Sequence, residues 1–196
     1  YVGGRDVSDG IVDYININIT DPCISSVMND ILSKDKQNEV MSYINREFGL
    51  NENCNMNISD VLNLTNLKGL SVAGNSTANR NNGILTVNIS INYGKNSSKE
   101  FIAATILHEM IHGYIASQNI PQNEIEEVIA DSLYIGWMSA SLISLFPNLS
   151  LNDANALALG GLQETSYFKS LSKDTQDASN ATNARHELGN EGQTCK

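Results

Sequence analysis

The sequence predicts an α+β fold, because segments with the two-residue period of strands and segments with helical spacing both occur along it. In Gly83–Tyr93, apolar side chains at alternate positions are separated by Thr, Asn and Ser, as in a half-buried strand. The segment Phe101–Ser117 is apolar on nearly every side, which is typical of a buried helix. The length of 196 residues suits a single domain spanning 1–196.

The chain begins with a strand followed by a helix. In Ile11–Thr20, Ile residues alternate with Asn, so a strand is predicted there. Asp21 and Pro22 then have the residue types of a helix N-cap and first helical position. Apolar residues at helical spacing extend this helix to Leu32.

The next region is predicted to be one helix and a long irregular stretch. A helix is expected over Lys36–Phe48, ending at Gly49. Residues 51–82 are rich in Asn and Gly, and we expect loops with short strands at Val61–Leu64 and Leu67–Val72.

The second half of the chain is predicted to be mainly helical. Ser97-Ser98-Lys99-Glu100 fits a capping box before the helix 98–118, and a further helix runs from about Pro121 to Leu145. Helical spacing returns in 151–171, with a break near Gly160-Gly161. Residues 172–196 are polar and weakly patterned, which indicates an extended tail or a strap over the fold.

Composition excludes some classes of partner. The net charge is −10 and the pI is about 4.6, which argues against nucleic acid because phosphate binding needs a basic face. No apolar run reaches the ~18–20 residues of a membrane span. We expect the chain to be a monomer.

The cysteines leave the redox state open. Three Cys are too few for a disulfide scaffold or a zinc ribbon. Either Cys23 pairs with Cys54 and leaves Cys195 over, or all three are free thiols. The compartment also stays open, with a secreted or extracellular location favoured.

One motif contains residue types that bind metals and transfer protons, His108-Glu109-Met110-Ile111-His112. Residues four apart on a helix leave the same face one turn apart, so both imidazoles can bind one Zn²⁺. Glu109 lies beside that face, where its carboxylate can take a proton from an attacking water and return it to the leaving amine. Burying these groups is costly unless a metal and hydrogen bonds satisfy them. The alternative is a structural helix with a hydrogen-bonded His pair.

This HExxH helix resembles that of the zincin metallopeptidases. The resemblance covers roughly residues 83–140 and implies a small mixed sheet packed on the active-site helix, with Leu85–Asn92 as the edge strand that aligns an extended substrate. The composition, and Ala103-Ala-Thr-Ile-Leu before the motif, also resemble the metallopeptidase domains that end large bacterial toxin or effector polypeptides.

In the gluzincin branch of this family, the third zinc ligand is a Glu in a downstream Glu-x-x-x-Asp pattern. Glu127-Val-Ile-Ala-Asp131 matches it, which implies Glu127 as ligand and Asp131 as the partner that orients His108. Glu124, Glu126 and His186 remain alternatives for the ligand. The metzincin pattern is excluded because position 118 is Gln.

The remaining histidine, His186, is a candidate oxyanion donor, because thermolysin-like enzymes use a His well downstream of the zinc site. The alternative is a solvent-exposed His of the tail. Tyr114 and Tyr167 are other candidate donors, and Trp137 is expected in the core.

The sequence thus predicts a zinc metallopeptidase in which His108, His112 and Glu127 hold Zn²⁺ and Glu109 is the general base. Two alternatives stay open. One is a non-catalytic interaction domain with a structural zinc, and the other is a zinc hydrolase of non-peptide amides.

Overall fold

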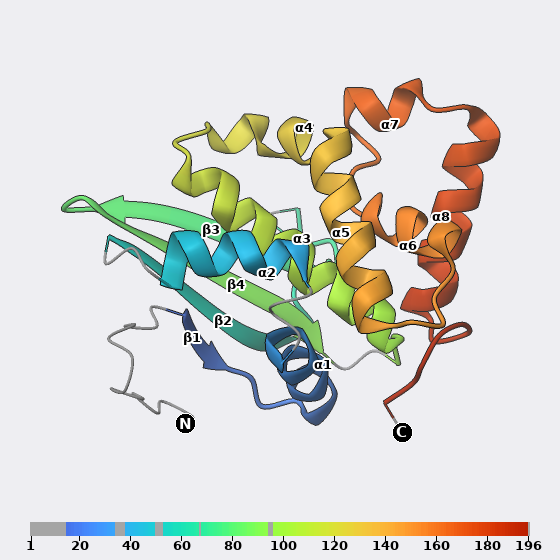
Figure 1. Ribbon diagram of the computed structural model, residues 1–196, viewed down its shortest axis with the longest axis horizontal. Coiled ribbons are helices and arrows are strands. Elements are labelled where there is room, and N and C mark those ends of the chain that lie inside the picture. The colour runs from blue at the N-terminus through green and yellow to red at the C-terminus, as the bar shows by residue number, and fades with distance from the viewer. Residues whose placement is uncertain (1–14, 34–37, 50–52, 67, 94–95, 196) are drawn as a thin grey trace.

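The computed structural model describes residues 15–33, 38–49, 53–66, 68–93 and 96–195. Within these residues one mixed sheet is formed in the order β1-β2-β4-β3 (Figure 1). Its strands are β1 (Ile15–Asn18), β2 (Cys54–Leu62), β3 (Gly74–Asn81) and β4 (Ile84–Tyr93). The pairs β1–β2 and β2–β4 are parallel, whereas β3 is antiparallel to β4.

The helices pack against this sheet and against one another. They are α1 (Pro22–Ser33), α2 (Glu39–Ile44), α3 (Lys99–Ser117), α4 (Ile125–Ile129), α5 (Ser132–Leu145), α6 (Leu151–Ala158), α7 (Ser166–Ser170) and α8 (Lys173–Glu187), with a π-helical turn η2 (Asn45–Gly49) and a 3₁₀ turn η3 (Gln122–Glu124). In Figure 1, α2 and α3 lie over the sheet, and α5 to α8 gather beyond its end. The predicted α+β class, with a small mixed sheet on the helix that carries HExxH, is confirmed.

The two faces of the sheet differ because residues alternate along each strand. Met56, Val87 and Ile89 are fully buried on the face that packs against the helices. The opposite face is polar, and its Asn side chains pair across strands, with Asn57 hydrogen-bonded to both Asn16 (3.1 Å) and Asn88 (2.9 Å). The hydrophobic core therefore extends from this face of the sheet through α3 to the surrounding helices.

The start of the chain follows the prediction where it is described. β1 and α1 form as expected, although residues 11–14 lie outside the described residues. The Asp21 carboxylate accepts hydrogen bonds from the backbone N–H groups of Cys23 and Ile24, both at 2.9 Å, so it caps α1. Part of the helix expected over 36–48 is also outside the described residues, and its remainder is α2 followed by η2.

The expectation for 51–82 is wrong. Most of this Asn-rich region forms two long strands, β2 and β3, instead of loops with short strands at 61–64 and 67–72, where Leu67 is outside the described residues. In β2, Cys54, Met56 and Ile58 do alternate with Asn. β3 has almost no apolar residues and is ordered by pairing along β4.

The expected position of Leu85–Asn92 at the edge of the sheet is also wrong. β4 lies between β2 and β3, so Leu85–Asn92 is not at the edge of the sheet. No described strand pairs with the outer side of β3. β3 is therefore the exposed edge next to α3.

The helical second half differs from the prediction at two places. The helix expected over 121–145 is divided, because α4 ends at Ile129 and α5 begins anew at Ser132. Residues 173–187, expected to be extended, form α8, and only the segment after it crosses the fold as a strap, here defined as residues 188–195.

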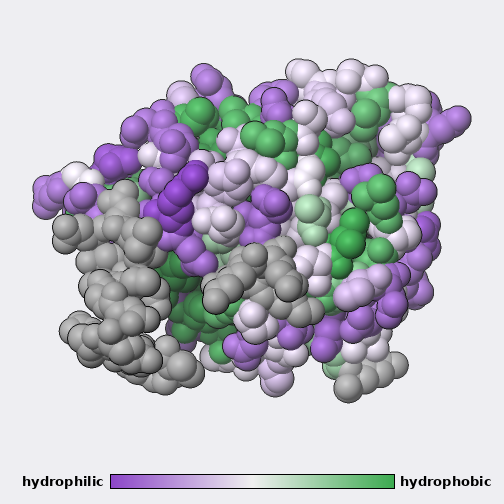
Figure 2. Space-filling view, viewed as in Figure 1, coloured by the Kyte–Doolittle hydropathy of each residue, from purple (hydrophilic) through white to green (hydrophobic). Residues whose placement is uncertain are grey.

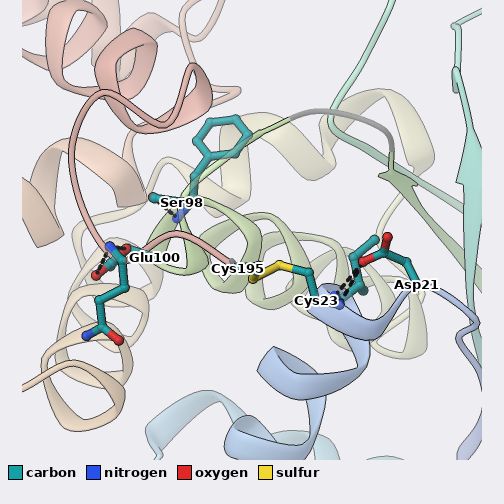
Figure 3. The surroundings of a disulfide bond; sticks show 8 residues. Asp21, Cys23, Ser98, Glu100 and Cys195 are labelled. Atoms are coloured by element: carbon teal, nitrogen blue, oxygen red, sulfur yellow. Dashed lines mark hydrogen bonds between the residues drawn. A yellow bond between two sulfur atoms is a disulfide. The ribbon is translucent and has the colours of Figure 1, made fainter.

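The strap is held at the start of α3 (Figure 3). Ser98, not Ser97, caps α3 by accepting a hydrogen bond from the Phe101 N–H. The predicted capping box is absent, since the buried Glu100 carboxylate accepts from the Gln193 N–H at 2.9 Å. Cys195 forms a disulfide with Cys23 and Cys54 is a buried free thiol, which corrects both expectations for the cysteines.

The described helices include none that is long and apolar enough to cross a membrane. On the face drawn in Figure 2, apolar residues form separate patches among polar ones.

Candidate metal centre

Helix α3 carries the motif in the middle of the molecule. Its apolar residues are buried on several sides because the sheet, α1, α2, α5 and α6 all contact it. His108 and His112 are each 8% exposed and Glu109 is 6% exposed. Three ionisable side chains are thus held in a largely apolar interior, where each needs a polar partner.

The two imidazoles face each other across one helical turn. Their Nε2 atoms are 3.1 Å apart. Both Nδ1 atoms are buried, and neither has a hydrogen-bond partner among the described residues. The two Nε2 atoms therefore point toward one common position.

The third group at this point is Glu126 of α4. Its Oε1 atom is 3.2 Å from Nε2 of His112, and its Oε2 atom is 3.8 Å from Nε2 of His108. The Glu126 side chain is 48% exposed, so the cluster opens to solvent on this side.

These three side chains fit a metal ion. Ligand atoms about 2.0–2.2 Å from one tetrahedral ion lie roughly 3.3–3.5 Å from each other. The distances of 3.1, 3.2 and 3.8 Å bracket that value. Within the described residues, this is the one group of three or more His, Cys, Asp or Glu that could hold a metal ion.

The protonation states also suit a metal site. Burial, and then the neighbouring His112, lowers the pKa of His108 to about 4 against the opposing charge of Glu126. Burial acts to raise the pKa of Glu126, but its hydrogen bond and its attraction to the two imidazoles lower it overall. At neutral pH His108 is neutral and Glu126 is ionised, which are the forms that bind metal.

In the metal-free protein the pKa of His112 shifts in the opposite direction to that of His108. Burial acts to lower its pKa, but the hydrogen bond to Glu126 and the charges of Glu109 and Glu126 raise it overall.

Glu109 lies beside this cluster and is not one of the three grouped side chains. Burial raises the pKa of its carboxyl to about 7, against the lowering effects of His112 and of a hydrogen bond from Ser76. A carboxyl with a pKa near neutral can exchange a proton readily at physiological pH.

Glu127, the zinc ligand that the sequence pattern implied, is not in the cluster with the two imidazoles. The Glu127 carboxylate accepts hydrogen bonds from the N–H (3.0 Å) and the hydroxyl (3.2 Å) of Ser166. It therefore links α4 to α7, whereas Glu126, an alternative at the sequence level, faces the imidazoles.

Asp131 does not orient His108. Because α4 ends at Ile129, Asp131 is not on one helix with Glu127, as the sequence pattern implied. Its carboxylate instead caps α5 by accepting from the Leu133 N–H at 2.8 Å.

His186 is neither beside the metal cluster nor solvent-exposed. It is 1% exposed, and its Nδ1 atom is 2.9 Å from the Ser98 hydroxyl at the start of α3. Ser98 precedes His108 by ten residues, about 15 Å along a helix. The expected oxyanion role is therefore wrong, and His186 packs where α8 meets α3.

The aromatic residues form a separate group. Trp137 packs against the core as expected and stacks on Tyr43 at 3.8 Å between ring centroids. Tyr114 meets both rings edge-on. Tyr167, the other candidate donor, is 38% exposed on α7.

Sequence reasoning missed the residues that pack around the motif. A Cβ atom at Gly161 would lie 3.3 Å from Cε1 of His108, and one at Gly74 would lie 2.8 Å from Cγ of Glu109. The break at Gly160-Gly161 was a usable signal. Gly74 and Ser76 gave none, because β3 itself was not predicted.

The comparisons with family models, curated proteins and solved structures find no match for this chain. The buried His108 and His112 with Glu126 are consistent with a zincin-like site.

Proposed function

We propose that this protein is a zinc-dependent peptidase in which His108, His112 and Glu126 hold the metal and Glu109 is the general base. The observation that carries the proposal is the Glu109 carboxyl, which is 6% exposed and directly follows the first of two converging imidazoles. Glu109 is not one of the three grouped side chains, so a buried carboxyl lies beside the proposed metal without being one of its ligands.

The ligand set supports zinc. Two imidazole nitrogens and one carboxylate oxygen are the three-residue set of many catalytic zinc sites, whereas structural sites are closed by four protein ligands. Bound zinc supplies Lewis acidity, which makes water a better nucleophile and polarises a carbonyl group.

In the proposed reaction, Glu109 transfers the proton and Glu126 lies at the opening to solvent. The ionised Glu109 accepts a proton from the attacking water and later donates it to the leaving amine, so its carboxyl returns to the starting state. Glu126 lies on the solvent side of the cluster, and its exposure of 48% provides a route for substrate.

The outer edge of β3 is the proposed site for the substrate backbone. This strand passes directly over Glu109 at Gly74. An extended peptide that adds to a sheet edge gains backbone hydrogen bonds without regard to its sequence. The proposed role of Leu85–Asn92 thus moves one strand outward, from β4 to β3.

The partners and compartment follow the same proposal. The acidic chain suits a peptide or protein substrate better than nucleic acid. The Cys23–Cys195 disulfide supports a secreted or extracellular location, because such bonds persist in oxidising compartments.

The test compares metal content with hydrolysis of a peptide library. The purified wild-type protein should contain close to one zinc per chain by elemental analysis, and His108→Ala should lose it. Glu109→Gln should keep the zinc but reduce hydrolysis by at least ~100-fold. Glu124→Gln, an exposed carboxylate of η3, is the matched control and should cleave like wild type.

Three results would contradict the proposal. Absence of zinc uptake would remove the metal site altogether. A fully active Glu109→Gln variant would remove the general base. A zinc-loaded wild type that cleaves no peptide would favour a structural zinc or a non-peptide amide substrate.

A further inference from the structure

Strand β3 lies in direct contact with the Glu109 side chain. Gly74, Ser76 and Ala78 face α3, because they pair with the buried residues of β4. At Gly74 the approach is close, since a Cβ atom there would lie 2.8 Å from Cγ and 2.9 Å from Oε1 of Glu109. The backbone of β3 therefore forms one wall of the space that holds this carboxylate.

Thr105 closes the same space from α3. It precedes Glu109 by one helical turn, and its Cγ2 atom would also lie 2.8 Å from a Cβ atom at Gly74. Its hydroxyl donates to the Phe101 carbonyl at 3.0 Å, which fixes the rotamer that points the methyl group at β3. A side chain at position 74 would have to displace Thr105, Glu109 or both.

Ser76 supplies a polar contact on this wall. It is two residues after Gly74 and on the same face of the strand. Facing α3 from β3, its hydroxyl lowers the pKa of the Glu109 carboxyl against the larger effect of burial. The missing side chain at Gly74 leaves room for this carboxylate, and Ser76 places a hydroxyl on the same face of the strand.

We propose that Gly74 and Ser76 are positioning residues that aim the Glu109 carboxylate for proton transfer. The inference rests on the proposed function of Glu109 as general base. A buried carboxylate has several rotamers, and a displacement of about 1 Å can reduce catalysis ~100-fold. Because both residues face Glu109 and neither is a proposed zinc ligand, their loss should reduce kcat more than it changes KM and should leave bound zinc unchanged.

The first experiment uses the zinc-loaded full chain and the best-cleaved library peptide. Ser76→Ala should lower kcat about tenfold without a matching change in KM or zinc content, and Ser76→Thr, which keeps the hydroxyl, should restore most of the rate. Gly74→Ala should lower kcat about 100-fold, because the added Cβ displaces the carboxylate. Ser90→Ala is the matched control, a serine on the opposite face of β4, and should have the kcat of wild type.

A second experiment does not depend on hydrolysis. In the metal-free protein, Ser76→Ala should lower Tm in the wild-type background and have a smaller effect in a Glu109→Ala background, because the partner of the hydroxyl is then gone. Ser90→Ala should lower Tm equally in both backgrounds.

The outcomes separate the two proposals. If wild type cleaves peptides but Ser76→Ala has full kcat, or if Ser76→Thr does not restore the rate, the positioning role is overturned and the peptidase stands. If zinc-loaded wild type cleaves no peptide, the proposed function fails. If Ser76→Ala lowers Tm equally in the wild-type and Glu109→Ala backgrounds, the proposed contact between Ser76 and Glu109 is overturned, whether or not the protein cleaves peptides.

Discussion

At the scale of single residues, Glu126 and Glu127 are neighbours with different partners. Successive residues on a helix point about 100° apart, so α4 directs one carboxylate toward α3 and the next toward α7. Glu126 lies 3.2 Å from Nε2 of His112, whereas Glu127 accepts from the N–H and hydroxyl of Ser166. Sequence spacing alone cannot distinguish these two directions.

Substitution of each carboxylate should separate the two roles. Glu126→Ala removes a proposed zinc ligand and should weaken zinc affinity by more than ~100-fold, beyond the ~10–100-fold typical of supporting residues. Glu127→Ala should weaken zinc affinity about tenfold or less, because this substitution only loosens the link from α4 to α7. Competition with a chromophoric chelator measures both, with Glu124→Ala as control. Equal losses for the two variants would contradict the assignment.

At the scale of elements, the break between α4 and α5 decides how the site is assembled. Continuous helix from 121 to 145 would have kept Glu127 and Asp131 on one face. Instead Asp131 has extended backbone geometry and caps α5, which gives α4 a direction of its own. The short helix α4 can therefore bring Glu126 to the imidazoles.

Asp131 should accordingly matter for stability and not for zinc. Asp131→Ala removes the N-cap of α5 and should lower the free energy of unfolding by about 1 kcal/mol. Asp131→Asn, which keeps a capping oxygen, should be close to wild type. Urea unfolding with metal titration checks both. A tenfold or larger loss of zinc affinity in Asp131→Ala at unchanged stability would restore its expected role beside His108.

At the scale of the whole molecule, the C-terminal strap connects the two ends of the described chain (Figure 3). Gln193 pairs with α3 twice, donating to the Glu100 carboxylate and accepting from the Lys99 N–H at 2.7 Å. The Cys23–Cys195 disulfide then joins the strap to α1, closing a sequence separation of 172 residues. The strap thus holds the start of α3, and the disulfide ties the strap to α1.

Loss of this disulfide should destabilise the fold without removing the proposed metal site. The loop-closure entropy for so long a separation amounts to at most about 5 kcal/mol. At about 2–4 °C per kcal/mol for a domain of this size, Cys195→Ser should lower Tm by on the order of 10 °C. A reductant should lower the Tm of wild type and of Cys54→Ala, yet leave Cys195→Ser unchanged. A reductant effect on Cys195→Ser would contradict this pairing.

Some features were predictable because they depend on local physics. The spacing of His108 and His112 places both on one helix face in any fold that keeps the helix, and the alternation in Gly83–Tyr93 makes a strand. The caps at Asp21 and near Ser98 are local backbone contacts as well. For these, a few neighbouring residues contain all the information.

Other features depended on contacts between distant segments. β3 is a strand because it pairs with β4, although it has almost no apolar side chains of its own. The choice of Glu126, the position of β3 against Glu109 and the Cys23–Cys195 pairing all depend on how separate elements meet. The sequence by itself determined the α+β class and the helix that presents two imidazoles. Only the tertiary structure decided which carboxylate completes the cluster, because the direction of α4 is set by its packing and not by its own residues.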